Sequence, residues 1–163
     1  MADRRLQPMF LAGAVFALDR LTKWIVETKV SVVDTYTVIP GFFDIVHSRN
    51  RGVAFSLFND STSPWRTTLL ILAAVAALVV VGCMIWRSSG MDRLGLWALG
   101  LIFGGALGNL FDRAVWGAVT DFLDFYVGNL HWPAFNVADS AVVIGSGLLL
   151  LDLMKPKRAP AQT

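Results

Sequence analysis

Long apolar runs alternate with short polar segments along this chain, a pattern that predicts four membrane-crossing helices. The predicted spans are, in order, residues 8–26, 67–86, 94–111 and 136–154. The second and third spans carry no charge, and about 20 apolar residues in helical form suffice to cross a hydrocarbon core of about 30 Å. The first span follows Arg4 and Arg5 without a small-residue cleavage site, which predicts an uncleaved helix and not a signal peptide.

The pattern changes in residues 30–64, where apolar and polar positions alternate as they do in strands. A turn at Pro40-Gly41 separates the first strand from a second at Phe42–Ser48, and a third is expected at Val53–Phe58. A small antiparallel β-meander beside the membrane, followed by a polar linker, is the simplest interpretation. Residues 112–135, between the last two spans, are expected to form an outer loop.

Composition supports one integral membrane domain. The chain of 163 residues is 55% hydrophobic and 16% charged, whereas soluble domains have about 25% charged residues. The predicted class is therefore an all-α membrane protein with four transmembrane helices and a small extramembrane antiparallel β-meander on the outer face. Gly100, Gly104 and Gly108 recur at four-residue spacing in the third span, a stripe that favours close helix packing over chemistry.

Basic residues predict the orientation of the chain. They cluster at the ends of the apolar runs and on three segments: the N-terminus, residues 87–93 and the C-terminal tail. The positive-inside rule places these segments, and so both termini, in the cytoplasm. The meander, Asp121 and Asp139 then lie on the outer side. Because the basic residues form no continuous stripe, no nucleic-acid partner is expected.

Several kinds of catalytic site lack their motifs in this sequence. There is no H-E-x-x-H zinc helix, and His47 and His131 are far apart. Gly145-Ser146-Gly147 has the wrong glycine spacing for a nucleophile elbow. No phosphate-binding glycine loop is present, and the single Cys83 leaves no disulfide partner. The sequence therefore predicts no metal and no cofactor.

Carboxylates beside hydrocarbon are the remaining candidates. Asp121 and Asp139 are each expected near a helix end, and an acid at membrane depth is a functional candidate. Two neighbouring carboxylates can share one proton, so that one takes a proton from water while the other donates to a scissile carbonyl. Asn136 is expected on the same helical face as Asp139. Spacing alone leaves two other functions open: an ion path through the acids, or an assembly subunit that uses the glycine stripe.

Other charged residues have simpler structural interpretations. Asp112 beside Arg113 is expected to cap or neutralise a helix end. Asp124 is expected to face interfacial water. Asp19 and Lys23, four residues apart in the first helix, are expected to form an intrahelical ion pair.

Five segments together resemble the lipoprotein signal peptidase family, also called signal peptidase II. They are, in chain order, ALDRLTK at 17–23, SRNRGVAFSLF at 48–58, GGALGNLFDR at 104–113, VTDFLDF at 119–125 and FNVADS at 135–140. They occur in register across all four predicted spans and the meander. Any one of them would be a weak signal, but five in order are specific.

The resemblance implies residue roles, a substrate and a location. It makes Asp121 and Asp139 the catalytic aspartates of an endopeptidase in the bacterial cytoplasmic (inner) membrane. The positions that would support the site or match the first motif are Asp19, Lys23, Asn50, Asn109, Arg113 and Asn136. The implied substrate is a prolipoprotein that carries diacylglycerol on a cysteine and is cut just before that cysteine. The segment near residues 58–65 resembles the family's mobile lid, and membrane lipid is the expected surrounding.

Overall fold

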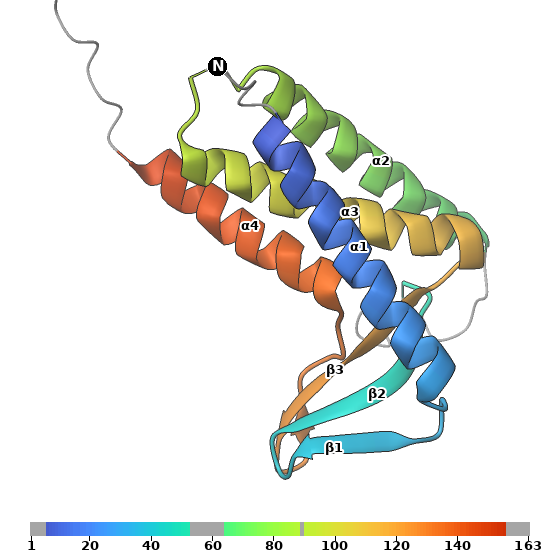
Figure 1. Cartoon of the computed structure of the whole chain (residues 1–163). Helices are drawn as coiled ribbons and strands as arrows, with labels where there is room; N and C mark the ends of the chain where they lie inside the picture. Colours follow the sequence, from blue (N-terminus) through green and yellow to red (C-terminus); the bar gives the residue numbers. More distant parts are fainter. Residues whose placement is uncertain (1–5, 53–63, 89, 156–163) are drawn as a thin grey trace, which may run out of the picture.

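The computed structural model describes residues 6–52, 64–88 and 90–155. In these ranges four α-helices pack together and a small sheet extends from one end of the bundle (Figure 1). The helices are α1 (Leu6–Lys29), α2 (Pro64–Trp86), α3 (Arg93–Trp116) and α4 (Val137–Met154). The protein is thus mostly helical with a small antiparallel sheet, as the sequence predicts.

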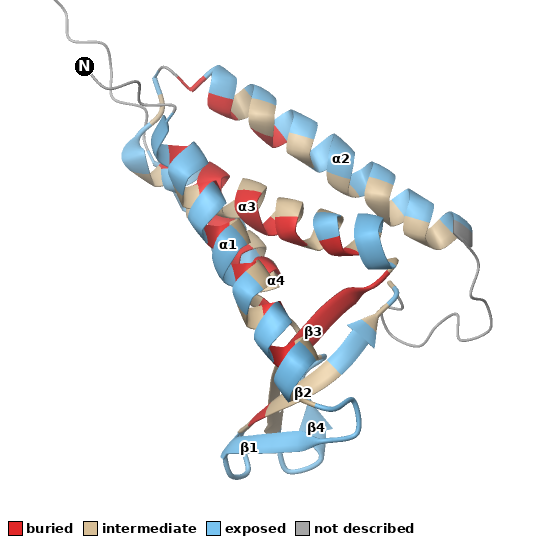
Figure 2. Cartoon of the chain, turned by 45° about the vertical axis from the view of Figure 1, so that its right-hand side comes forward, coloured by how far each residue is buried: buried red, intermediate tan, exposed pale blue. Residues whose placement is uncertain are grey.

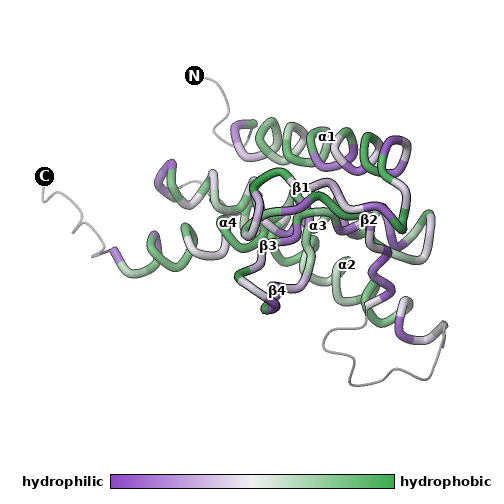
Figure 3. Tube along the Cα trace, turned by 90° about the horizontal axis from the view of Figure 1, so that it is seen from below, coloured by the Kyte–Doolittle hydropathy of each residue, from purple (hydrophilic) through white to green (hydrophobic). Residues whose placement is uncertain are grey.

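Three of these helices, α2, α3 and α4, are long and apolar enough to cross a membrane. The remaining helix, α1, is 24 residues long but carries Asp19, Arg20 and Lys23 in its second half. Figure 3 shows the resulting mixture of hydrophilic and hydrophobic residues along α1. Two of these charged residues point into the protein, because Asp19 and Lys23 are both fully buried.

The sheet has four antiparallel strands in the order β1-β2-β3-β4. Their bounds are β1 (Thr35–Ile39), β2 (Phe43–Asn50), β3 (Val119–Val127) and β4 (Leu130–His131). The first two strands agree with the predicted meander. The third predicted strand, Val53–Phe58, lies outside the described residues.

The prediction of an outer loop at 112–135 is wrong in two ways. First, α3 continues to Trp116 and ends at Gly117, whose φ of 69° is a left-handed conformation that glycine adopts without strain. Second, residues 119–127 form β3, because β2 offers a strand edge with which they pair. The two acids in this segment interrupt a run of β-branched and aromatic residues that otherwise favours a strand.

The glycine stripe packs helices, as predicted. A Cβ atom on Gly100 would lie 2.7 Å from the carbonyl oxygen of Pro8, and one on Gly104 would lie 2.6 Å from that of Ala12. At Gly108 the added atom would meet the Asp19 carboxylate at 2.6 Å. The backbone of α3 therefore approaches α1 closely, and this approach brings the acid of α1 into contact with α3. Figure 2 shows the buried positions concentrated on α1, α3 and β3, while most of α2 is exposed.

Candidate active site

Asp121 lies on β3, at the point where the sheet meets the helices. Its side chain is 3% exposed. Asn136 Nδ2 donates a hydrogen bond to Asp121 Oδ1 at 2.7 Å, and Asn50 Nδ2 donates to Oδ2 at 3.0 Å. Strand pairing between β2 and β3 sets this second contact, since Asn50 and Asp121 are both in the paired stretch. Both oxygens of the buried carboxylate are therefore hydrogen-bonded, and by neutral amides.

Asp139 lies in the first turn of α4 and takes part in a capping box. The side chain of Asn136 accepts from the Asp139 backbone N–H at 2.9 Å, and Asp139 Oδ2 accepts from the Asn136 backbone N–H at 3.3 Å. The other oxygen, Oδ1, accepts from Asn109 Nδ2 at 2.7 Å. The cap fixes the Asp139 carboxylate at the helix start, where the positive end of the helix dipole favours a negative charge.

Asn136 joins the two acids. Its side-chain amide donates to Asp121 while its backbone N–H donates to Asp139. The same amide also approaches Asn109 Oδ1 at 3.3 Å. We call these five residues the amide cluster: Asn50, Asn109, Asp121, Asn136 and Asp139. The predicted pairing of Asp121 with Asp139 is thus supported by a shared hydrogen-bond donor.

The electrostatics of the amide cluster affect Asp121. Burial raises the pKa of its carboxyl to about 6, because removal from water disfavours the charged form. Repulsion from Asp139 raises this pKa as well, while the hydrogen bonds from Asn50 and Asn136 lower it. A pKa near 6 suits a group that takes up and releases a proton near neutral pH.

A second buried cluster lies beside the first, between α1 and α3. Lys23 Nζ lies 2.7 Å from Asp19 Oδ2 and 2.7 Å from Asp112 Oδ2, and none of these three side chains is exposed. Arg20 donates to the other oxygen of Asp112. We call Asp19, Arg20, Lys23 and Asp112 the ion cluster. The predicted Asp19–Lys23 pair is confirmed, and Asp19 Oδ1 also accepts from the Ala138 backbone N–H at 2.9 Å.

The two clusters touch at one amide. Lys23 Nζ donates to Asn109 Oδ1 at 3.1 Å, and the other end of the same amide donates to Asp139. Lys23 therefore fixes the orientation of the Asn109 side-chain amide, since only the amide oxygen can accept a hydrogen bond from an ammonium group.

The simple interpretation of Asp112 is wrong. Asp112 does not neutralise Arg113 at the end of a helix. It points into the protein and pairs with Lys23 and Arg20 of α1. Arg113 donates instead to the Asn109 backbone carbonyl at 3.3 Å, and its buried Nε has no hydrogen-bond partner among the described residues. Asp124 is paired with His131 at 2.9 Å and is only 14% exposed, so it does not simply face water.

Sequence reasoning assigned no role to Arg20, Glu27 or Thr120. The Arg20 guanidinium lies over the rings of Phe111 and Trp116, at 5.2 and 4.6 Å from their centroids. Glu27 accepts a hydrogen bond from Thr120 Oγ1 at 2.7 Å and so ties α1 to the residue before Asp121. The available signal was the spacing of Arg20, Lys23 and Glu27, which places all three on neighbouring parts of one helical face.

A pocket of ≈ 330 Å³ opens beside Asp121. Its lining residues come from the end of β2, from β3 and from the segment before α4: Ser48, Arg49, Asn50, Arg51, Asp121 and Ala134. The catalytic candidate on β3 is therefore reachable by a ligand. No group of three His, Cys, Asp or Glu side chains that could hold a metal ion occurs in the described part of the chain.

Comparison with known proteins identifies the family. A family model described as signal peptidase (SPase) II matches residues 11–155. This chain belongs to that family. It is 60% identical to the lipoprotein signal peptidase of Solibacter usitatus, over 99% of this chain and 98% of that protein. It is 44% identical to the lipoprotein signal peptidase of Oleidesulfovibrio alaskensis, over 96% of this chain and all of that protein.

Solved structures agree with the sequence relatives. One structure described as a bacterial membrane enzyme has a TM-score of 0.79 at 30% identity and covers 96% of this chain and 94% of its own. A second has a TM-score of 0.80 at 29% identity and covers 93% and 94%. As a signal peptidase II, the protein is a protease that cleaves the signal peptides of lipoprotein precursors. Prolipoproteins are its substrates.

Proposed function

We propose that this signal peptidase II is an aspartic endopeptidase in which Asp121 and Asp139 are the catalytic pair. The observation that carries the proposal is Asn136, whose side chain and backbone hydrogen-bond the two acids at once. One carboxyl of the pair takes a proton from the attacking water, and the other donates a proton to the oxygen of the scissile carbonyl. The pair shares one proton, because two neighbouring carboxylates resist being charged together.

The surrounding residues hold and complete this pair. Asn50 and Asn109 each fix one oxygen of one acid. Asp19 and Lys23 act at a distance, since Lys23 orients the Asn109 amide. The Arg113 Nε–H, without a hydrogen-bond partner among the described residues, is a donor available to the substrate backbone.

We propose further that the substrate is a prolipoprotein with diacylglycerol on its cysteine, cut just before that cysteine. A lipid-bearing peptide moves in the plane of the bilayer, so a site where helices meet a sheet suits it. The pocket beside Asp121 is lined by polar side chains that can receive a peptide backbone. This assignment involves membrane lipid as surroundings and requires no nucleic acid.

The topology we propose has four spans, with α1 crossing together with α2, α3 and α4. The buried charges of α1 are satisfied inside the protein, which removes the main obstacle to its crossing. Both termini then lie in the cytoplasm of a bacterium and the sheet lies on the outer side of the inner membrane. Cysteines at Asp34 and Asp92 should react with impermeant reagents from opposite sides. Reaction of both from one side would exclude this arrangement.

The experiment that tests the catalytic pair is cleavage of a synthetic peptide with a diacylglyceryl cysteine. Asp121→Asn and Asp139→Asn should each abolish cleavage while the purified protein stays folded, because an amide cannot accept the proton from water. The double variant should lose little more than either single one, since the two residues act as a unit.

The matched control is Asp124→Asn, on the same strand as Asp121 but paired with His131. It should retain most of the parent's turnover. Near-parent cleavage by either Asp121→Asn or Asp139→Asn would refute the proposal, and so would an Asp124→Asn variant as inactive as both.

A further inference from the structure

The free end of the sheet carries a group of exposed apolar side chains. They come from the β1–β2 turn and from the β3–β4 hairpin, and we call them the sheet tip: Val38, Ile39, Phe42, Val127, Leu130 and Trp132. The last three are 71%, 79% and 69% exposed. So much exposed apolar surface in one place indicates an interaction site.

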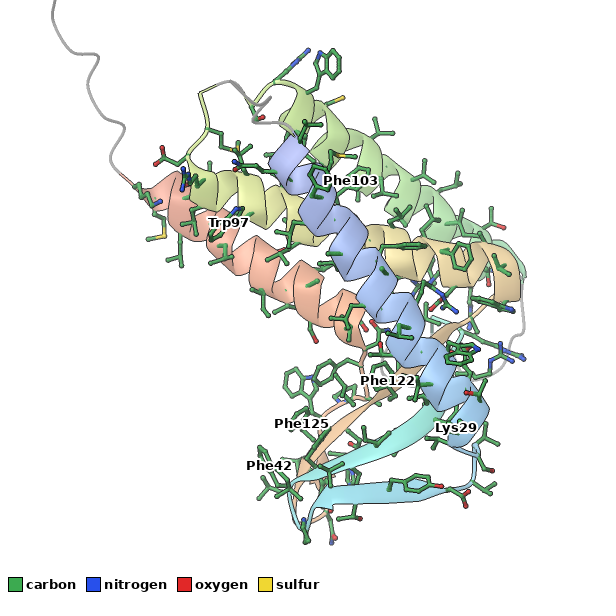
Figure 4. The ribbon with its side chains drawn as sticks, viewed as in Figure 1. Lys29, Phe42, Trp97, Phe103, Phe122 and Phe125 are labelled. Atoms are coloured by element: carbon green, nitrogen blue, oxygen red, sulfur yellow. The ribbon has the colours of Figure 1, made fainter. Side chains whose placement is uncertain are left out.

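The two turns of the sheet tip lie next to each other. The Tyr126 backbone N–H donates to the Phe42 carbonyl at 2.9 Å, and the Gly41 N–H donates to the Tyr126 hydroxyl at 3.2 Å. The rings of Phe42 and Phe125 are 5.4 Å apart (Figure 4). The exposed side chains therefore form one continuous end of the sheet and not scattered surface residues.

The sheet tip is uncharged. Residues 38–43, 125–130 and 132–135 contain no Asp, Glu, Lys or Arg. The charged residues that flank these segments directly in the sequence are acids, Asp44 and Asp124, and the second of these is paired with His131. The sheet tip therefore offers no charge with which a charged partner could pair. An apolar surface with tryptophan is typical of protein that lies at the boundary between lipid and water.

A row of stacked rings links the sheet tip to the start of α4. Phe43 stacks on Phe125 at 4.6 Å, and Phe125 stacks on Phe135 at 5.7 Å. Phe135 immediately precedes Asn136, the N-cap of α4, and α4 is apolar enough to cross a membrane. The end of such a helix lies at the membrane boundary, so the row of rings begins there.

The direction of the strands agrees with this placement. In Figure 1 the strands run across the direction of α1, and the sheet tip lies on the opposite side of the sheet from the C-terminal end of α1. The sheet tip therefore lies to one side of the end of α1 in this view. The interfacial layer of a bilayer is roughly 5–8 Å thick on each side, which one or two stacked rings can span.

We propose that the sheet tip inserts into the interfacial layer of the lipid leaflet on the sheet's side of the membrane. The occupant of this surface is lipid, at the level of the headgroups and upper acyl chains. Insertion removes apolar side chains from water, and it requires no anionic headgroup because the tip carries no basic residue. It fixes the depth of the sheet, and with it that of β3, relative to the bilayer.

The test uses the full chain in phosphatidylcholine vesicles, with Cys83→Ser to remove the native cysteine and one new cysteine carrying an environment-sensitive fluorophore. At Leu130→Cys the fluorophore should emit at shorter wavelength and be quenched by lipids with a nitroxide near the headgroup, and little by iodide. The matched control is Val33→Cys. Val33 is 86% exposed and aliphatic, but lies at the other end of the sheet beside Asp34, and should show the reverse pattern.

Two further measurements make the result decisive. Adding Val127→Asp should return the Leu130 fluorophore to water, as judged by iodide quenching, and raising the salt concentration should not. Equal iodide quenching at Leu130 and Val33 would overturn the proposal. So would protection at Leu130 that disappears when each vesicle holds one copy of the protein, because the occupant would then be a second copy.

Discussion

The ion cluster and the amide cluster are neighbouring groups of buried acids with opposite electrostatics. In the ion cluster, Asp19 and Asp112 each lie 2.7 Å from the ammonium of Lys23. In the amide cluster, Asp121 and Asp139 accept hydrogen bonds from asparagines, and neither acid forms an ion pair with a described residue. One pair of acids is neutralised by cations, and the other is only solvated by amides.

The difference shows how one small protein can use buried acids for two purposes. The carboxylates of the ion cluster have a buried ammonium to balance their charge, and the contact between Lys23 and Asp112 holds α1 against α3. A carboxylate hydrogen-bonded by neutral amides keeps its shape but not a fixed protonation state, as the raised pKa of Asp121 shows. The boundary between the two lies at Asn109, which contacts Lys23 with its oxygen and Asp139 with its nitrogen.

Removal of the Lys23 cation from the ion cluster should destabilise the protein strongly. Lys23→Met leaves two buried carboxylates without their shared cation, so the free energy of unfolding should fall by about 3–5 kcal/mol. Thermal or denaturant unfolding of the purified protein measures this loss. Lys29→Met is the control, because Lys29 is exposed in the last turn of the same helix and should change stability by less than about 0.5 kcal/mol. Similar losses in both variants would contradict a structural role for the ion cluster.

The pH dependence of stability tests the amide cluster. The pKa of Asp121 is about 6 in the folded protein and 3.8 without burial, so the folded state binds this proton more tightly. Its contribution to stability is therefore complete below about pH 4 and is lost as the pH rises to about 6. The unfolding free energy of Asp121→Asn, relative to the parent, should rise across this window by on the order of 1–3 kcal/mol. Parallel pH curves for the two proteins would show that Asp121 is not perturbed.

Removal of a single amide from the amide cluster tests the role of Asn50. Asn50→Ala removes one hydrogen bond to a carboxylate, worth about 1.5–3 kcal/mol, so cleavage should fall roughly ten- to a hundred-fold. This hydrogen bond lowers the pKa of Asp121, so its loss should raise that pKa. The part of the pH–rate profile that reports ionisation of the Asp121–Asp139 pair should then move to higher pH. Asn129→Ala, at an exposed turn, should alter neither quantity. An unshifted profile for Asn50→Ala would remove Asn50 from the site.

The sequence predicted the helices well and the second half of the sheet poorly. Apolar runs alone predict α2, α3 and α4, because in these helices almost every position is apolar. β3 could not be predicted from its own residues, since its pairing partner β2 lies some 70 residues earlier and its acids disguise the strand pattern.

The candidate site was predicted more completely than its supports. Asp121 and Asp139 follow from acids beside apolar runs together with the family resemblance. The partners of Asp112 do not, because a side chain about two-thirds of the way along the chain gives no sign that it meets Arg20 and Lys23 near the start. Such contacts depend on the helix packing that Gly104 and Gly108 allow, which a sequence pattern indicates only as closeness.

The turn of the β3–β4 hairpin should be able to change length without disturbing Asp121 and Asp139. Phe135 is fastened to β3 on both sides of its peptide unit, since its N–H donates to Leu123 at 3.1 Å and its carbonyl accepts from Phe122 and Leu123 at 3.0 and 2.9 Å. This fastening isolates the distal turn from the two acids on either side of the hairpin. Insertions or deletions at Gly128-Asn129 should therefore be tolerated, whereas a single added residue between Phe135 and Asp139 would disconnect the helix start from its strand.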